Sequence, residues 1–265
     1  MAGPPELFDS ALRSLRRDRA ARCGPALFLH ERALSDILER LSAINRRFSS
    51  LLLVGAPDPE WRSRLEKLAP KITIVDPGAV FAKSSGGIHA IEDEFDLDPA
   101  SFDLAIAIGT LDTVNDLPGA LLRLRFLLKP DSLLIGAMSG GETLPRLRQA
   151  MRAADSVTGA ASPHIHPRIE PASLAQLLTS TGFVMPVVDI DRVNVAYRDL
   201  RQLVGDLRSM GATNILKSRA RRPLSRAALE AADREFAPGA GQSRITETFE
   251  ILHFAAWSPL SAGHG

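Results

Sequence analysis

The sequence predicts an α/β domain in which helices cover both faces of a mainly parallel sheet. Short apolar runs such as Leu51-Leu52-Leu53-Val54 and Phe102 to Ile108 are typical of strands that are buried on both faces. Segments with apolar residues at helical spacing separate these runs. Strands that alternate with helices indicate right-handed βαβ crossovers, and the 265 residues suffice for one such domain with insertions.

Each element is predicted from its local pattern. Two helices are expected over residues 8–41, separated at Gly24-Pro25, because glycine and proline interrupt a helix. Asp58 and Pro59 favour the N-cap and first position of the next helix. The expected strands are 51–54, 72–75, 88–91, 102–108, 132–138, 183–191 and 247–257. The expected helices between them are 59–68, 117–128, 143–155 and 171–181.

We expect one main domain with additions at both ends. Residues 1–48 form an N-terminal helical segment, and residues 49–257 form the main domain. A helical insertion is expected over about residues 193–240, before the last strand. Residues 258–265 are expected to be a frayed tail.

Composition excludes several classes of function. The 32 Lys and Arg residues nearly balance the 31 Asp and Glu residues, and aromatic residues make up 5%, so we expect no nucleic-acid partner. The single cysteine, Cys23, allows no internal disulfide and fits a reducing compartment. Asp9 and Asp18 interrupt the Arg-rich start, which favours a cytosolic helix over a transit peptide. We therefore expect a cytoplasmic protein.

Several motifs resemble those of a known family. Phe102-Asp103-Leu104, Val114-Asn115-Asp116-Leu117-Pro118 and Leu128-Lys129-Pro130-Asp131 resemble the motifs of the class I methyltransferase-domain family. Five more segments are similar to the subfamily of mitochondrial complex I assembly factor 5: Ile135-Gly136-Ala137-Met138, Gly140-Gly141-Glu142-Thr143-Leu144, Ser162-Pro163-His164-Ile165, Phe8-Asp9-Ser10 and Arg16-Arg17-Asp18-Arg19-Ala20-Ala21. The resemblance covers roughly residues 7–257.

The resemblance implies a fold, a cofactor and a partner. The fold is a Rossmann-like, seven-stranded class I methyltransferase fold, and the cofactor is S-adenosyl-L-methionine (SAM). The subfamily is associated with assembly of respiratory complex I and is credited with hydroxylating an arginine of a complex I subunit. A protein partner, a complex I subunit, is therefore expected for this chain.

The first strand-to-helix turn departs from the pattern of the family. The family has Asp-x-Gly-x-Gly-x-Gly at this turn, and only Gly55 remains of it here. Leu53 replaces the acidic residue, and Pro57 and Pro59 replace the later glycines. Proline fixes φ near −65° and has no N–H, so the glycine conformations and two donors are lost together. Standard binding of SAM is therefore in question at this turn.

Other candidate cofactor residues follow the next strands. Asp76 ends the second strand, where such folds place an acceptor for the ribose hydroxyls, although an Asp here equally fits a helix cap. Glu92 and Asp93 fall at the family's adenine contact, but three acids in a row are more often a solvated loop. Gly109 opens the segment after the fourth strand, where the resemblance implies the methionine end of the cofactor.

The sequence gives little indication of which residues are catalytic. Asp112 and His164 are candidates by position alone. His164-Ile165-His166 places two imidazoles on one side of a loop, but the carboxylate that an iron triad needs is missing beside them. We therefore expect no metal site, and a loop held by hydrogen bonds is the alternative for this segment.

The expected insertion carries a local excess of basic residues. It offers a docking face for an acidic protein partner or for peripheral contact with the anionic inner membrane. A solubilising helical face is an equally weighted alternative. The basic residues are Arg201, Arg208, Lys217, Arg219, Arg221, Arg222 and Arg226.

Two hypotheses from different classes remain open on the sequence. The first is an enzyme, a SAM-dependent methyltransferase or a SAM-binding relative that modifies a complex I subunit. The second is a pseudoenzyme, a methyltransferase-like scaffold that has lost the cofactor and acts through protein–protein contacts. Pro57 and Pro59 favour the second hypothesis, whereas Asp76 and the intact later motifs favour the first, which we take as the main interpretation.

Overall fold

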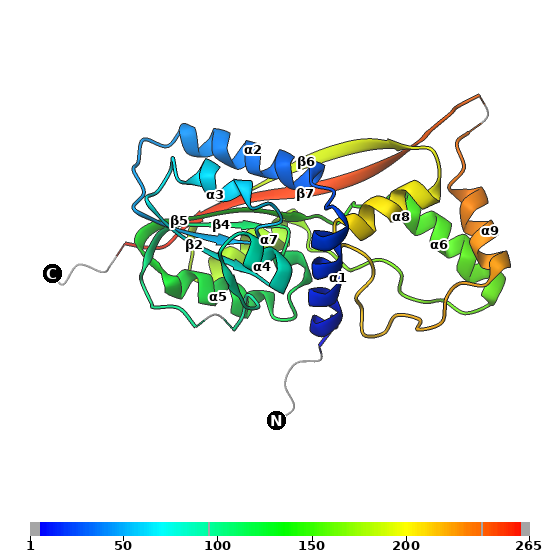
Figure 1. Ribbon diagram of the computed structural model, residues 1–265, viewed down its shortest axis with the longest axis horizontal. Coiled ribbons are helices and arrows are strands. Elements are labelled where there is room, and N and C mark those ends of the chain that lie inside the picture. The colour runs from blue at the N-terminus through cyan, green and yellow to red at the C-terminus, as the bar shows by residue number, and fades with distance from the viewer. Residues whose placement is uncertain (1–5, 95, 240, 261–265) are drawn as a thin grey trace.

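A computed structural model describes residues 6–94, 96–239 and 241–260, which contain a seven-stranded sheet in the order β3-β2-β1-β4-β5-β7-β6 (Figure 1). The strands are β1 (Ser50–Val54), β2 (Lys71–Asp76), β3 (Ile88–His89), β4 (Phe102–Ile108), β5 (Leu128–Ser139), β6 (Val184–Tyr197) and β7 (Ile245–Trp257). Strand β7 runs antiparallel to both β5 and β6, and the remaining pairs are parallel. The predicted Rossmann-like, seven-stranded fold is confirmed.

Helices cover both faces of this sheet (Figure 1). The helices are α1 (Ser10–Cys23), α2 (Phe28–Ser42), α3 (Glu60–Leu65), α4 (Ala79–Ser84), α5 (Leu117–Leu127), α6 (Pro145–Thr158), α7 (Pro171–Ser180), α8 (Leu200–Ser209) and α9 (Arg226–Glu235). Helices α2 and α3 bury apolar residues against one face, and α5 and α7 bury theirs against the other. None of the described helices combines the length and apolar character that crossing a membrane needs.

The strands form where the continuous apolar runs predict them. All five residues of β1 are buried, and six of the seven residues of β4 are buried. A parallel strand with helices on both faces has no polar side, which explains why these runs do not alternate. Because these strands are parallel, the strand-to-helix turns that follow them lie at one edge of the sheet, which we call the carboxyl edge.

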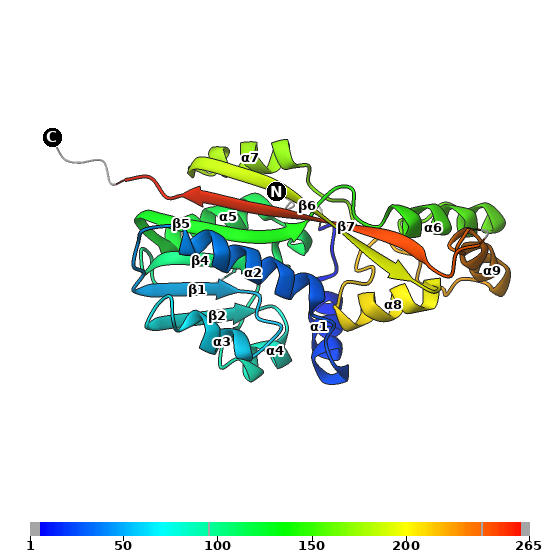
Figure 2. The same ribbon diagram turned by 90° about the horizontal axis from the view of Figure 1, so that it is seen from above.

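The last two strands extend past the sheet. Strand β7 pairs with β5 only over 251–257, whereas its ladder with β6 continues to Ile245. The projecting ribbon packs against α6, α8 and α9 around a separate apolar core that includes Tyr197, Leu203 and Phe236 (Figure 2). At the opposite end of β6, the register shifts between Val184 and Val187. The ribbon and its three helices form an arm beside the main sheet.

Several boundaries differ from the expected ones. Helix α3 is shorter than 59–68, because its last turn closes on the carbonyl of Leu65 ahead of Pro70. The third strand has two residues instead of four, Ile88–His89. Strand β6 continues to Tyr197, so residues 193–197 of the expected insertion belong to the sheet.

The tail expected over residues 258–265 is described by the structure only as far as residue 260. Residues 1–5 and 261–265 lie outside the described residues. Ser258 was expected in the frayed tail, but it is buried. Its N–H donates to the carbonyl of Ser132 at 2.8 Å and its hydroxyl donates to the carbonyl of Lys129 at 2.8 Å. The sheet contacts therefore continue one residue beyond β7.

We predict that Leu203→Ala destabilises the protein by about 2–5 kcal/mol, because it removes a fully buried side chain from the core of the arm. Leu229→Ala on α9 is the control, since Leu229 is 46% exposed and its truncation should change the free energy of unfolding by about 0.5 kcal/mol. Urea unfolding followed by circular dichroism measures both changes. Equal losses in the two variants would contradict this description of the arm.

Candidate functional site

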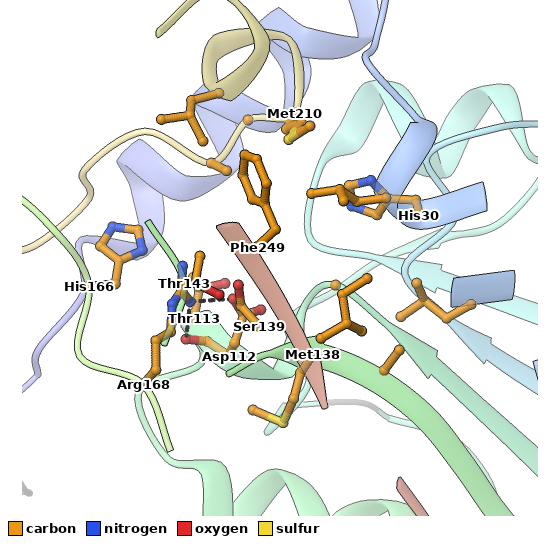
Figure 3. Close-up of a pocket in the computed structure, with 18 of the residues that line it drawn as sticks. His30, Asp112, Thr113, Met138, Ser139, Thr143, His166, Arg168, Met210 and Phe249 are labelled. Atoms are coloured by element: carbon orange, nitrogen blue, oxygen red, sulfur yellow. Dashed lines mark hydrogen bonds and ion pairs between the residues drawn. The ribbon is translucent and has the colours of Figure 1, made fainter. Parts of the chain in front are cut away.

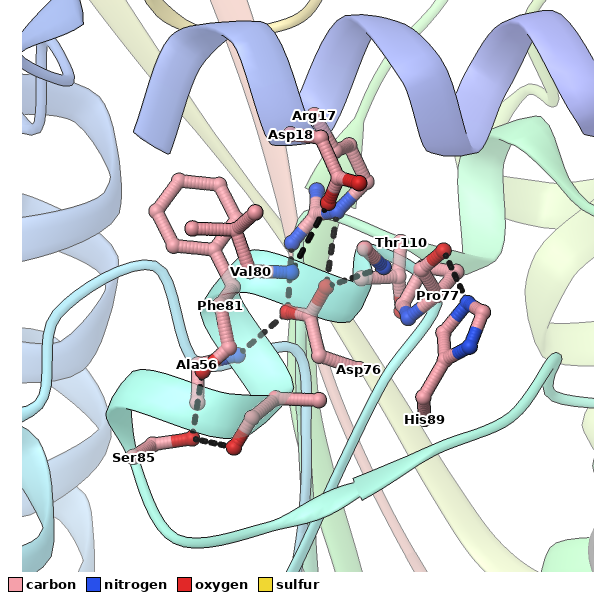
Figure 4. A network of polar contacts seen from close by, with 12 residues as sticks. Arg17, Asp18, Ala56, Asp76, Pro77, Val80, Phe81, Ser85, His89 and Thr110 are labelled. Carbon is pink, nitrogen blue, oxygen red and sulfur yellow. Dashed lines mark hydrogen bonds and ion pairs between the residues drawn. The ribbon is translucent and has the colours of Figure 1, made fainter. Parts of the chain in front are cut away.

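Helix α1 lies across the carboxyl edge and binds the carboxylate of Asp76 (Figure 4). Nε of Arg17 donates to Oδ1 at 3.0 Å and Nη2 of Arg17 donates to Oδ2 at 2.7 Å. The N–H of Ala56 donates to Oδ2 at 2.9 Å, and the N–H of Gly78 donates to Oδ1 at 2.7 Å. A carboxylate has about four lone-pair positions, so four donors occupy its whole accepting capacity.

A second buried pair lies one helical turn away. Nη1 and Nη2 of Arg13 donate to the two carboxylate oxygens of Glu92 at 2.8 and 2.7 Å. Arg13 also donates to the hydroxyl of Thr113 at 2.9 Å and to the carbonyl of Thr110 at 2.6 Å. Glu92 is fully buried, so the alternative of a solvated loop is wrong for this residue. Asp93 is half-buried, and burial raises the pKa of its carboxyl.

These pairs neutralise charges that are removed from water. Burial acting alone would lower the pKa of Arg17, but the attraction of Asp76 and its hydrogen bonds raise that pKa above the ordinary value. A buried ion without its partner is costly, by several kcal/mol, so each arginine stabilises the carboxylate that it meets. Gly78 permits the close approach of α1, since a Cβ at this position would lie 2.9 Å from Cβ of Arg17.

The first strand-to-helix turn uses its donors within the protein. Gly55 has φ +87°, and a Cβ there would lie 2.3 Å from the carbonyl oxygen of Ile108, so this glycine is required. Its N–H donates to the carbonyl of Val75 at 2.9 Å. Asp58 accepts from the N–H of Glu60 at 2.9 Å, at the start of α3. Pro57 and Pro59 have no N–H, so this turn offers fewer backbone donors to a ligand than the glycine-rich turn of the family would.

The residues at this edge are of the type that binds the ribose of SAM, but the acceptor positions of the carboxylate are already filled by donors of the protein. Asp76 is a buried acceptor at the end of β2, and Gly55 brings two strands close together. Every lone-pair position of Asp76 accepts a donor from the protein itself. A ribose hydroxyl can therefore bond to this carboxylate only in place of Arg17.

A cavity of about 120 Å³ lies beside α1, at the carboxyl ends of β4 and β5 (Figure 3). Asp112 forms an ion pair with Arg168 in its wall, and both side chains are at least nine-tenths buried. Met138, Met210 and Phe249 supply apolar wall on the other sides. Arg13 and Arg17 also line the cavity, so α1 separates it from the carboxylates that it covers.

Two histidines of the cavity wall are neutral at pH 7. Burial, with a smaller contribution from the nearby Arg17, lowers the pKa of His30 to about 4. Burial likewise lowers the pKa of His166 to about 4, with Arg168 adding to the effect. Nε2 of His166 accepts from the N–H of Ile215 at 2.9 Å, which assigns the proton to Nδ1. Nδ1 of His30 has no hydrogen-bond partner among the described residues.

The predicted site residues separate into two groups. Gly109 and Asp112 line the cavity, whereas Asp76 and Glu92 are covered by the arginines of α1. His164 lies elsewhere, with its Nε2 2.8 Å from Oδ1 of Asp155. His164 and His166 thus bond to different partners, and within the described ranges no three His, Cys, Asp or Glu side chains are arranged to hold a metal ion.

Four residues of this region were not predicted from the sequence: Arg13, Arg17, His30 and Arg168. His166 was considered only as a possible metal ligand beside His164, and the structure places it in the cavity wall. The spacing of Arg13 and Arg17, four residues apart on one helix face, was an available signal, because two buried basic residues on one face need two acids. No local pattern marks His30 or Arg168, whose surroundings come from distant segments.

Two basic residues of the insertion pair with acidic residues at the start of α1. Lys217 forms an ion pair with Glu6, and Nη2 of Arg219 lies 3.2 Å from Oδ2 of Asp9. The backbone joins them as well, with Asp9 N–H donating to the carbonyl of Ile215 at 2.9 Å. Arg201, Arg208, Arg221 and Arg222 remain exposed.

Comparisons with known proteins agree with this arrangement. A family profile described as "Methyltransferase domain" matches residues 28–186. Arginine-hydroxylase NDUFAF5, mitochondrial, of Danio rerio is 30% identical over 267 aligned positions, covering 96% of this chain and 83% of that protein. YcgJ of Bacillus subtilis has a TM-score of 0.56 at 9% identity, covering 84% of this chain and 97% of that chain. N-methyltransferase NodS of Bradyrhizobium japonicum WM9, in complex with S-adenosyl-L-homocysteine (SAH), has a TM-score of 0.50 at 16% identity, covering 95% and 100%.

We predict that the protein loses stability as the pH falls from about 6.5 towards about 4. The unfolded chain binds protons at His30 and His166 in this window, whereas the folded protein does not, so stability that is present above pH 6.5 is lost below it. The loss is about 1 kcal/mol per pH unit for each histidine. Urea unfolding at pH 7 and pH 5 measures it.

The matched variant for this prediction is His166→Asn, whose amide oxygen can still accept from Ile215. It should lose less stability between the two pH values than the unmodified protein, because one of the two histidines is gone. Identical losses would show that His166 keeps its ordinary pKa in the folded state.

Proposed function

This chain belongs to the methyltransferase domain family and is homologous to the arginine-hydroxylase NDUFAF5, and from this premise we propose that it modifies an arginine side chain of a protein partner. The proposed partner is a subunit of respiratory complex I, and the proposed cofactor is SAM. The role in assembly of that complex follows from the same proposal. The enzyme acts on a protein and not on nucleic acid.

The observation that carries this proposal is the Asp112–Arg168 pair in the cavity wall. It supports an arginine substrate, because a carboxylate that holds one guanidinium can hold another in its place. The apolar wall of Met138, Met210 and Phe249 suits the stem and the planar head of an arginine side chain. His30 adds a neutral imidazole whose Nδ1 is free of partners within the described residues.

The residues proposed to hold SAM are Gly55, Asp76, Glu92, Asp93 and Gly109. Asp76 would accept from the ribose hydroxyls, and Gly109 would face the methionine end beside the cavity. When bound, SAM supplies either a transferable methyl group or an organising ligand next to the substrate arginine. Asp112 would orient that arginine, whereas His164 lies away from the cavity and has no part in this proposal.

The exposed basic residues of the insertion form the proposed contact surface for a partner or a membrane. Arg201, Arg208, Arg221 and Arg222 suit an acidic face of the partner or the anionic surface of the inner membrane. The proposed location is the cytoplasm, with peripheral contact at that membrane.

A second candidate is a scaffold that assembles complex I without a cofactor. The full occupation of Asp76 by Arg17 and two backbone N–H groups favours it, together with Pro57 and Pro59 in the turn. Assembly of complex I without modification of an arginine would support the scaffold and not the enzyme.

The test of the proposed function uses a strain that lacks the gene. Complementation with the unmodified protein should restore one complex I arginine that carries an added oxygen atom or methyl group, as read by mass spectrometry of the purified complex. Asp112→Asn should remove most of that modification, because a neutral amide holds a guanidinium much more weakly.

Glu142→Gln serves as the control for this experiment, since Glu142 is exposed and does not line the cavity. If assembly is restored and no strain contains a modified arginine, the scaffold hypothesis replaces the enzyme hypothesis.

A further inference from the structure

We infer that α1 is a built-in competitor of the adenosine half of the cofactor, and that the site opens only when α1 withdraws. This inference rests on the proposed binding of SAM at the carboxyl edge. It goes beyond that proposal because it assigns a function to Arg13 and Arg17, the two arginines that α1 presents to this edge. The helix and the ribose require the same lone pairs of Asp76.

The competition follows from the accepting capacity of one carboxylate. Arg17 supplies two of the four donors of Asp76, and the backbone of Ala56 and Gly78 supplies the other two. The backbone donors belong to the turns that shape the edge, so they remain when a ligand enters. Arg17 is the only one of the three donor residues that sits on a separate element, and it is the donor that a ribose would replace.

The two arginines withdraw together because they share one rigid face. Arg13 and Arg17 are four residues apart on α1, and each makes a bidentate contact with a buried acid. Asp18 ties the same helix to α4, since its Oδ1 accepts from the N–H of Val80 at 2.9 Å. A ligand that displaces Arg17 therefore disturbs the adjacent contacts of Arg13 and Asp18.

Withdrawal also enlarges the site. Arg13 and Arg17 line the cavity at the ends of β4 and β5 as well as the carboxylates. Because the same two side chains contact Asp76 and Glu92, we expect their withdrawal to connect the cavity with these carboxylates and to give one space for the two halves of the cofactor. The closed form with α1 in place offers only the methionine half.

The start of α1 is held by the insertion and by Asn115, which lies in the loop between β4 and α5. Phe8 forms an isolated β-bridge with Leu216, and the side chain of Asn115 bonds to both backbone groups of Phe8 at 2.7 and 3.0 Å. Arg219 contacts Asp9 at 3.2 Å. The contacts of Leu216 and Arg219 connect α1 to the same insertion that carries the exposed basic residues.

The test is calorimetric titration of the full-length protein with SAH. Arg17→Met removes two donors from Asp76, and we expect it to bind SAH about ten-fold tighter or more than the unmodified protein. Arg19→Met is the matched control, because Arg19 lies on the same helix but is exposed, and its affinity should stay unchanged. Circular dichroism establishes that each variant is folded.

A second variant and a second readout cover the case in which Arg17→Met fails to fold. Asn115→Ala frees the start of α1 while leaving Arg17 and Asp76 in place, and it should also tighten SAH binding. In the unmodified protein, saturating SAH should speed amide hydrogen exchange in residues 10–23, because the closed helix is released.

Three results would overturn the inference. Equal SAH affinities in the unmodified protein, Arg17→Met and Asn115→Ala would show that α1 does not compete, and so would slower exchange in α1 with SAH. Absence of binding in every folded variant would also overturn it. The arginine modification in cells is a separate measurement. Tighter binding in the variants without a modified arginine would leave the inference standing, and equal affinities with a modified arginine would leave the proposed function standing.

Discussion

The arrangement of the carboxyl edge depends on the buried carboxylate of Asp76. It gathers three separate segments: the turn after β1 through Ala56, the turn after β2 through Gly78, and helix α1 through Arg17. A charge at this depth must be fully hydrogen-bonded, which gives each segment a fixed place. Because a ribose would need the same group, the interaction that organises this edge also limits what it can bind.

The arm links the edge to an exposed, basic surface. The ribbon of β6 and β7 carries α8 and α9 away from the main sheet, and the loop after α8 returns to contact α1 near Phe8 (Figure 2). Residues from α8, β7 and α1 all contribute to the cavity wall. A single small cavity therefore joins the parallel half of the fold to the arm, which is why its lining residues come from most of the length of the chain.

The fold was predictable from sequence to a much greater degree than the site. The uninterrupted apolar runs of β1 and β4 are typical of parallel strands that are buried on both faces. The structure confirms both strands where these runs predict them. Asp76 and Asp112 were recognisable because they follow strands. The pairing of Arg17 with Asp76 joins residues 59 positions apart, and no periodicity encodes it. His30 is similar, since its low pKa arises from burial by elements that local patterns do not bring together.

The break in register near the start of β6 has a consequence for solubility. Strand β6 is the open border of the sheet and exposes Met185 and Val187, a combination that invites intermolecular strand addition. Pro186 sits inside the break and offers no N–H, and Asp189 engages Arg40 further along. A neighbouring molecule thus finds an interrupted and charged border, which guards this sheet against growth into aggregates.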